Sequence, residues 1–104
     1  MFMLDDLAET IAKRADASAE QSYTRSLLAK GAVYCARKFG EEAIELTIAG
    51  AAEGENAVRS EAADVLYHLL VLLQARGVPF ASVMAELESR TRQSGHQEKA
   101  SRRS

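Results

Sequence analysis

Four acidic side chains are spaced so that they could share one divalent cation. Glu42 and Glu45 form a Glu-x-x-Glu pattern, and after 15 further residues Glu61 and Asp64 form Glu-x-x-Asp. Side chains three apart on a helix have Cβ atoms about 5–6 Å apart, so each pair could hold a cation together. Two helices joined by a short connection run antiparallel, an arrangement that can bring the two pairs into one cluster.

The first pair lies within the stretch KFGEEAIELTIAG, residues 38–50, which reads as helix. At about 100° per residue, Glu42 and Glu45 share one sector of this helix with Glu41 and Lys38. Large apolar residues border the sector on both sides, namely Ile44, Ile48, Leu46 and Phe39. A solvated acidic face would lie opposite such residues. We therefore expect these carboxylates to point into the helical bundle or into a cleft in it.

Partly buried carboxylates at helical spacing repel one another and lose solvation, which is unfavourable without a partner. A hard divalent cation relieves both effects, and Mg²⁺ in particular prefers oxygen ligands and shares them with substrate phosphates. No cluster of Cys or His side chains competes in the sequence, so zinc and copper are not expected. Either acidic pair alone is more typical of a solvated face paired with lysine or arginine, but the two pairs together favour a metal site.

Magnesium held by carboxylates on helices suits chemistry at phosphate esters or phosphoanhydrides. The metal neutralises phosphate charge, activates water as a nucleophile and stabilises the departing phosphate. Glu41 adjoins the first pair and could help bind metal or act as a base toward water. Lys38 on the carboxylate face and Lys30 just before Gly31 could contact phosphate, although isolated lysines are more often only solvated.

Two other reactive side chains are better explained by packing. His68 follows Asp64 by one helical turn and could support the metal ligands, but a histidine hydrogen-bonded in the core is the more frequent case. Cys35 has no histidine at helical spacing and no activating motif. It is interpreted as a small packing residue.

Composition indicates a single globular domain. The 104 residues are 47% apolar and 27% charged, with a net charge of -2, so no global field favours nucleic acid or an anionic membrane. The single Cys35 excludes an internal disulfide and fits a reducing cytoplasm. The longest apolar run, residues 65–73, is about half the length that spans a bilayer. We expect a soluble cytoplasmic protein that binds neither nucleic acid nor membrane.

Helical periodicity and the absence of an alternating pattern predict an all-α fold. The elements expected are helices over residues 4–15, 22–31, 32–52, 56–77 and 80–92, with Ser22 and Asn56 as N-caps and a polar linker over residues 16–21. One domain would span residues 1–93, and residues 94–104 would form a polar, basic tail. The fourth helix is apolar almost all round over residues 65–73, which suggests that a second subunit helps to bury it.

With these residues in hand, the chain resembles the phosphoribosyl-ATP pyrophosphatases, the histidine-pathway branch of the MazG-type all-α nucleotide pyrophosphohydrolases. The four acids match the Glu-x-x-Glu…Glu-x-x-Asp signature of that superfamily. The narrower similarity is textual, because SYTRSLLAKG, KFGEEAIEL, EAADVLYHLLVLL and ARGVPFASVMAELESR occur in the family's order, and SGHQEKASR resembles an ending found among its members. The similarity covers nearly the whole chain from Ser22 onward.

The resemblance implies a MazG-type bundle of about five helices, completed by homodimerisation. It implies that Mg²⁺-activated water attacks the α–β phosphoanhydride of phosphoribosyl-ATP, giving phosphoribosyl-AMP and pyrophosphate at the second step of L-histidine biosynthesis. The family's metal positions fall on Glu42, Glu45, Glu61 and Asp64, its catalytic acids on Glu41, Glu42 and Glu45, and its basic substrate contacts on Lys30 and Lys38. The segment Ser22 to Thr24 also matches, with a role left open between substrate binding and helix initiation.

Two alternative functions remain open from the sequence. A housekeeping pyrophosphohydrolase of the same superfamily, acting on nucleoside or deoxynucleoside triphosphates, would carry the same metal motif. A non-catalytic helical dimerisation module would use the acids only as surface charge. Comparing the turnover of phosphoribosyl-ATP with that of a panel of dNTPs distinguishes the housekeeping enzyme, which would turn over a dNTP faster. Measuring thermal stability with Mg²⁺ distinguishes the non-catalytic module, whose stability would not change.

Overall fold

The computed structural model describes residues 1–18 and 22–92 of the chain. Within these residues there is no strand, and the elements in order are α1 (Leu4–Arg14), α2 (Tyr23–Ala29), α3 (Ala32–Ala52), α4 (Glu55–Arg76) and α5 (Phe80–Thr91). The predicted all-α fold is therefore confirmed. The predicted tail, residues 94–104, and the domain boundary after residue 93 lie outside the described residues.

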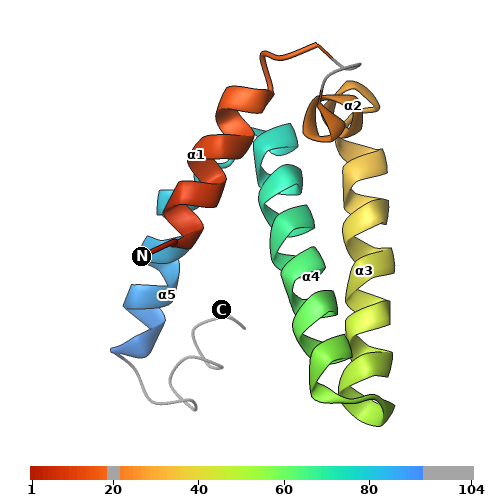
Figure 1. Ribbon diagram of the computed structural model, residues 1–104. Helices are drawn as coiled ribbons and strands as arrows, with labels where there is room; N and C mark the ends of the chain where they lie inside the picture. The colour runs from red at the N-terminus through yellow and green to blue at the C-terminus, as the bar shows by residue number, and fades with distance from the viewer. Residues whose placement is uncertain (19–21, 93–104) are drawn as a thin grey trace.

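The two long helices form an antiparallel hairpin. α3 and α4 lie side by side along most of their length, and α1 and α2 pack at one end of the pair (Figure 1). The tight connection at Glu53 and Gly54 joins the two helices, with the Glu53 N–H donating to the Ala49 carbonyl at 2.9 Å. This hairpin brings residues near 42–45 of α3 opposite residues near 61–64 of α4.

The start of α4 differs from the prediction. Gly54, in extended conformation, is the N-cap, and the helix begins at Glu55. Asn56 therefore lies in the first turn, where its Oδ1 accepts a hydrogen bond from Arg59 Nη1 at 2.9 Å. The asparagine side chain contacts a side chain one turn ahead instead of capping the backbone, so the predicted Asn56 cap is wrong.

The short helix α2 begins as predicted. The Ser22 Oγ accepts a hydrogen bond from the Arg25 N–H at 3.2 Å, which caps the first turn. Gly31 turns the chain from α2 into α3 with φ of 93° and ψ of 167°, a backbone conformation that favours glycine. Gly77 adopts the αL conformation and ends α4.

The hydrophobic core lies at the end of the hairpin that α1 and α2 cover. Its fully buried apolar side chains come from four helices, and they are Ile11, Leu27, Cys35, Leu70 and Val71. Cys35 fills a packing position as predicted, and its thiol donates to the Leu27 carbonyl at 3.3 Å. Burial raises the pKa of this thiol, which keeps it protonated and unreactive.

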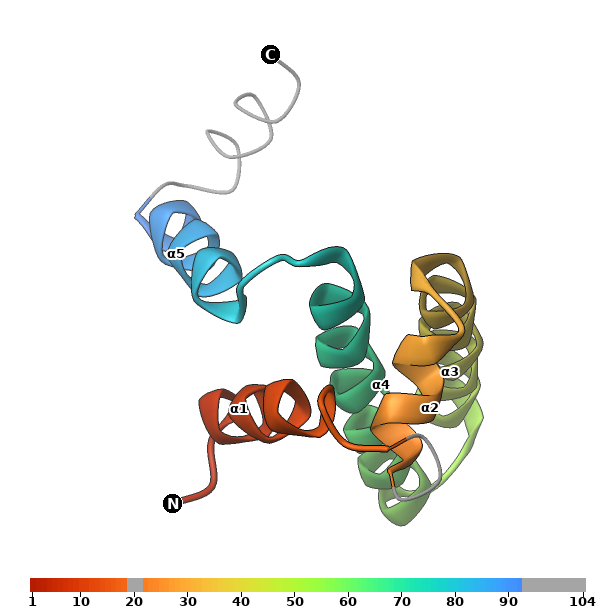
Figure 2. The same cartoon turned by 90° about the horizontal axis from the view of Figure 1, so that it is seen from above.

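The apolar segment of α4 is not covered on all sides within one chain. In residues 65–73 only His68, Leu70 and Val71 are buried, and Leu66 is exposed. Within one chain, the neighbouring helices cover only part of the α4 surface. The predicted help of a second subunit in burying this segment stays a prediction. α5 follows the turn at Gly77 and lies on the α1 side of α4, away from α3 (Figures 1 and 2).

No single helix among the described residues is long and apolar enough to cross a membrane. α4 and α5 reach the necessary length and composition only when taken together, and they meet at an angle of 113°.

Candidate metal centre

Three of the four predicted metal ligands converge between α3 and α4. One carboxylate oxygen from each of Glu42, Glu45 and Glu61 lies within 4.8 Å of the others. The antiparallel hairpin produces this arrangement because one turn of α3 faces one turn of α4. Oxygens at this separation could all bind one cation with a modest adjustment of side-chain rotamers.

Asp64 is the fourth predicted ligand and lies at the edge of the cluster. Its side chain is exposed and is not one of the three that meet within 4.8 Å. Its charge nevertheless contributes to raising the pKa of both Glu42 and Glu61, so it belongs to the same local field. The structure thus brings the three glutamates together, and Asp64 lies beside them without joining the group.

The cluster concentrates negative charge that the nearby Lys38 ammonium offsets only in part. Burial raises the pKa of Glu42, and the hydrogen bond and charge of neighbouring Glu45 raise it further. The pKa of Glu61 is raised for the same reasons, burial first and Glu45 second. In addition, Glu61 Oε2 is buried without a hydrogen-bond partner. Buried polar atoms are normally satisfied, so this carboxylate fits a site that a hard cation would complete.

Lys38 connects the cluster to the basic side of α3. Its Nζ lies 3.9 Å from Glu42 Oε1 and 3.6 Å from Glu41 Oε2. The pKa of Lys38 is raised, mainly by its electrostatic interaction with Tyr23 and further by the Glu41 and Glu42 carboxylates. Burial acts in the opposite direction and lowers this pKa. Lys38 therefore holds a positive charge directly beside the carboxylates, as the prediction of a phosphate contact requires.

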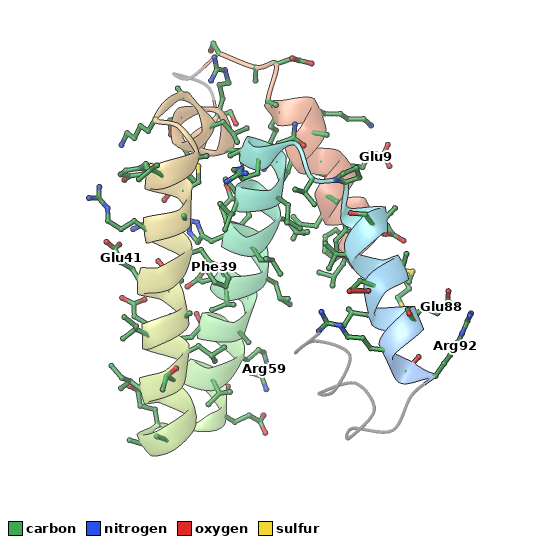
Figure 3. The ribbon with its side chains drawn as sticks, turned by 180° about the vertical axis from the view of Figure 1, so that it is seen from behind. Glu9, Phe39, Glu41, Arg59, Glu88 and Arg92 are labelled. Carbon is green, nitrogen blue, oxygen red and sulfur yellow. The ribbon has the colours of Figure 1, made fainter. Side chains whose placement is uncertain are left out.

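Glu41 lies on a different face from the cluster. Its side chain extends from α3 on the side away from α4, whereas Phe39 points toward α4 (Figure 3). The Glu41 carboxylate is largely exposed and reaches the cluster only through Lys38. Helical spacing places Glu41 in the same sector as Glu42. A helical wheel gives the direction of each side chain around α3, but it does not show which of these directions faces α4.

The structure does not bring Lys30 to the carboxylates. Its ammonium lies over the Tyr34 ring, 4.6 Å from the centroid, and the Arg37 guanidinium lies 5.4 Å from the same centroid. Tyr34 precedes Glu42 by eight residues, about 12 Å along the helix axis. These three side chains form a cationic surface that begins two turns from the cluster.

An aromatic group that sequence reasoning did not identify lies beyond Lys38. The Tyr23 ring stacks on Tyr67 with centroids 6.3 Å apart and 16° between planes, and His68 meets both rings edge-on. His68 is buried as expected, but its Nδ1 has no hydrogen-bond partner, so the expected hydrogen bond is absent at that atom. No local spacing could reveal this group, because Tyr23 and Tyr67 are far apart in sequence.

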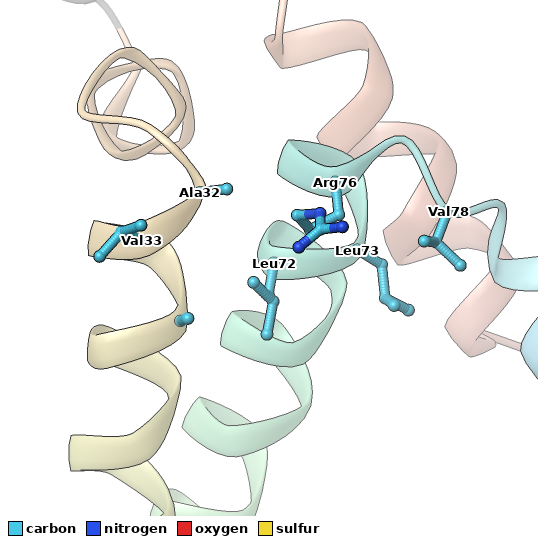
Figure 4. Close-up of a pocket in the computed structure, with 7 residues that line it drawn as sticks. Ala32, Val33, Leu72, Leu73, Arg76 and Val78 are labelled. Carbon is cyan, nitrogen blue, oxygen red and sulfur yellow. The ribbon is translucent and has the colours of Figure 1, made fainter.

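An apolar pocket lies away from the carboxylates. A cavity of about 390 Å³ opens between the first turns of α3 and the last turns of α4, and Arg76 is its one charged lining residue (Figure 4). Its other lining residues are apolar, namely Ala32, Val33, Ala36, Leu72, Leu73 and Val78. It holds no acidic group that could bind a cation, so the acidic cluster remains the candidate site for the chemistry.

Comparison with known proteins shows the family of the chain. A model of the family described as phosphoribosyl-ATP pyrophosphohydrolase matches residues 4–91. The chain belongs to this family. A phosphoribosyl-ATP pyrophosphatase of Azorhizobium caulinodans is 59% identical over 95% of this chain and 91% of its own length. Phosphoribosyl-ATP pyrophosphatase 1 of Bradyrhizobium diazoefficiens is 55% identical over 98% of this chain and 96% of its own length. The resemblance drawn from the sequence motifs is confirmed.

Proposed function

We propose that this chain hydrolyses phosphoribosyl-ATP at the α–β phosphoanhydride to give phosphoribosyl-AMP and pyrophosphate, the second step of L-histidine biosynthesis. The observation that carries the proposal is the convergence of Glu42, Glu45 and Glu61 from two helices in a member of this family. Relatives with the corresponding name match over almost their full lengths. Their names favour this substrate over the nucleoside triphosphates of the housekeeping enzymes, which the carboxylates alone do not distinguish.

The cation that we assign to the cluster is Mg²⁺, with Glu42, Glu45, Glu61 and Asp64 as its protein ligands. The donor set fits, since it consists of carboxylate oxygens and includes the buried, unpartnered Glu61 Oε2. When bound, Mg²⁺ supplies neutralisation of phosphate charge and lowers the pKa of water. The raised pKa values of Glu42 and Glu61 favour the same assignment, because the ionised cluster is unfavourable without a counter-charge.

The side chains around the cluster have complementary tasks in this proposal. Lys38, beside Glu42, neutralises a substrate phosphate and fixes its position relative to the cluster. Glu41 lies on the side of α3 away from the cluster (Figure 3) and pairs with the Lys38 ammonium at 3.6 Å, so it orients that lysine toward the substrate phosphate. Lys30 ends α2 and places its ammonium over the Tyr34 ring of α3, where it contributes positive charge for a more distant phosphate of the substrate.

We further propose that the chain works as a homodimer in the cytoplasm. Ile44 and Ile48, beside the acidic cluster on α3, are 63% and 53% exposed, and Leu66 on α4 is also exposed. Ile44 and Ile48 are one helical turn apart, and exposed apolar side chains grouped in this way favour a protein interface. Light scattering of the purified protein should give twice the chain mass of 11.3 kDa, and a single-chain mass would contradict the dimer.

The decisive assay measures Mg²⁺-dependent turnover of phosphoribosyl-ATP and of each dNTP at equal concentration. We expect phosphoribosyl-ATP to be the fastest substrate and a chelator to abolish the activity. Faster turnover of a dNTP would assign the chain to the housekeeping reaction. Complementation of a histidine auxotroph that lacks this step, by wild type but not by Glu45→Gln, tests the assignment in the cell.

A further inference from the structure

The Tyr23 side chain combines high exposure with a fixed position. Tyr23 is 59% exposed as a residue, yet its ring stacks on Tyr67 with centroids 6.3 Å apart and meets the His68 ring in a T-shaped contact at 6.5 Å. Tyr67 is itself held, since its hydroxyl shares a hydrogen bond of 2.6 Å with the buried Thr24 Oγ1. The Ser22 cap fixes the backbone where α2 begins. An exposed ring that is oriented in this way is prepared to stack on a flat partner.

The position of Tyr23 relative to the acidic cluster is also defined. Lys38 contacts Glu42 at 3.9 Å, and the Tyr23 hydroxyl lies near enough to interact electrostatically with the same ammonium. From Glu45 to Lys38 the helix axis advances about 10 Å. Carboxylates, a cation and an aromatic ring therefore follow one another along the same side of the hairpin.

This order matches the chemical order of a nucleotide. Carboxylates with a metal suit the phosphoanhydride that is cut, a lysine suits the adjoining phosphate, and an aromatic ring suits a base. We propose that Tyr23 is the stacking surface for a purine ring of the nucleotide substrate and that it sets the preference for a purine-bearing ligand. The inference rests on the proposed function and extends it to a residue outside the metal ligands and the predicted lysines.

A second copy of the chain is the competing occupant of this surface. Covering the Tyr23 ring with protein would also desolvate the Lys38 ammonium beside it and the Glu41 and Glu42 carboxylates that contact that ammonium. Desolvated charges oppose association unless each is paired across the interface. A nucleotide instead brings phosphates for the lysine and a ring for the tyrosine, so the ligand is the better match to these groups.

The test separates ring recognition from phosphate recognition. Binding of AMP and of pyrophosphate is measured by calorimetry with Mg²⁺ present, for wild type, Tyr23→Leu and Tyr23→Phe. We expect Tyr23→Leu to weaken AMP binding by about five- to a hundredfold, as loss of one base–aromatic stack does. Pyrophosphate, which has no ring, should bind all three proteins equally, and Tyr23→Phe should retain AMP binding because it keeps the ring.

Several results would overturn the inference. Equal weakening of AMP and pyrophosphate by Tyr23→Leu would assign the residue to the general structure of the site. Unchanged AMP binding would remove Tyr23 from the base site, and loss of the dimer mass together with AMP binding would assign the ring to the subunit interface. If Tyr23→Leu fails to fold, weakened AMP binding by Tyr23→Phe would contradict stacking. Because binding is measured without turnover, failure of wild type to hydrolyse phosphoribosyl-ATP would refute the proposed function separately.

Discussion

The two ends of the α3–α4 hairpin use the same pair of helices for opposite purposes. At the end covered by α1 and α2, Cys35 and Val71 are almost fully buried in an apolar core. About two turns along α3, Glu42 and Glu45 meet Glu61 of α4, and burial raises the pKa of Glu42 and of Glu61. One end stabilises the hairpin, and the other accumulates like charge that destabilises it.

The difference shows how a small domain separates stability from chemistry. Packing in the apolar end fixes the register of α3 against α4, and that register alone determines which carboxylates meet. A cation bound to the acidic cluster would turn the contribution of the cluster to folding stability from unfavourable to favourable. The reason is that a ligand that binds only the folded state stabilises that state. Substitutions at the two ends should therefore change activity and stability in opposite ways.

The largest expected effect comes from the acidic end. Glu45→Gln should reduce Mg²⁺-dependent turnover at least about a hundredfold, beyond the 10–100-fold typical of residues that only support a metal ligand. The same change removes a like charge, so the metal-free protein should melt at the same or a higher temperature. Steady-state kinetics and thermal unfolding in chelator provide the two measurements.

Glu9→Gln is the matched control for that substitution. Glu9 is an exposed carboxylate on α1, where it pairs with Lys13 at 3.2 Å, and neutralising it should change neither turnover nor stability appreciably. Retained turnover in Glu45→Gln would refute the metal assignment. A clear loss of stability in the metal-free variant would contradict the view that the acidic end is under electrostatic strain.

The apolar end should show the reverse pattern. Leu27→Ala removes a large, fully buried side chain from the core and should lower the free energy of unfolding by about 2–5 kcal/mol. Turnover per folded molecule should change little at a temperature where the variant remains folded. Denaturant unfolding measures this loss of stability. Val33→Ala is the control, because Val33 is 86% exposed, and it should change the free energy of unfolding by less than about 0.5 kcal/mol.

A smaller effect is expected where α2 begins. Ser22→Ala removes the hydroxyl that accepts from the Arg25 N–H and should cost about 1 kcal/mol of stability. Ser22→Asn keeps a side chain that can cap the helix and should therefore retain most of this stability. If the two variants unfold at the same denaturant concentration, the cap does not stabilise α2, and the fixed orientation of Tyr23 needs another origin.

The smallest effect is a dependence of stability on pH in the metal-free protein. Glu42 and Glu61 have folded-state pKa values above the usual 4.5, so in this window the folded chain binds more protons than the unfolded chain. Stability should therefore rise as pH falls from neutral toward 4.5, and it should be lost as pH rises through the raised pKa values.

Melting temperatures measured between about pH 5 and pH 8 test this sign, and Glu61→Gln should flatten the curve. Saturating Mg²⁺ should oppose the trend, because the metal binds the deprotonated carboxylates and its stabilisation grows with pH. A metal-free protein that gains stability as pH rises through this range would contradict the raised pKa values.

Much of the fold followed from local patterns in the sequence. The bounds of α3 match the prediction, and the Ser22 cap is confirmed, because capping and helical periodicity depend on neighbouring residues. The error at Asn56 arose because Gly54 and Asn56 are both acceptable N-caps, and only the hairpin geometry selects one. Residues 65–73 are only partly buried in the single chain, and composition does not reveal which sides of the helix the chain itself covers.

The sequence by itself determined the helices, the two acidic pairs and their spacing, since each depends on residues within a few turns of one another. Only the tertiary structure decided that Glu42, Glu45 and Glu61 meet most closely while Asp64 stays at the edge. It alone stacked Tyr23 on Tyr67 near the Lys38 ammonium, because that stack requires α2 to pack across the end of the hairpin. Packing between helices depends on side chains distant in sequence, and no local spacing encodes it.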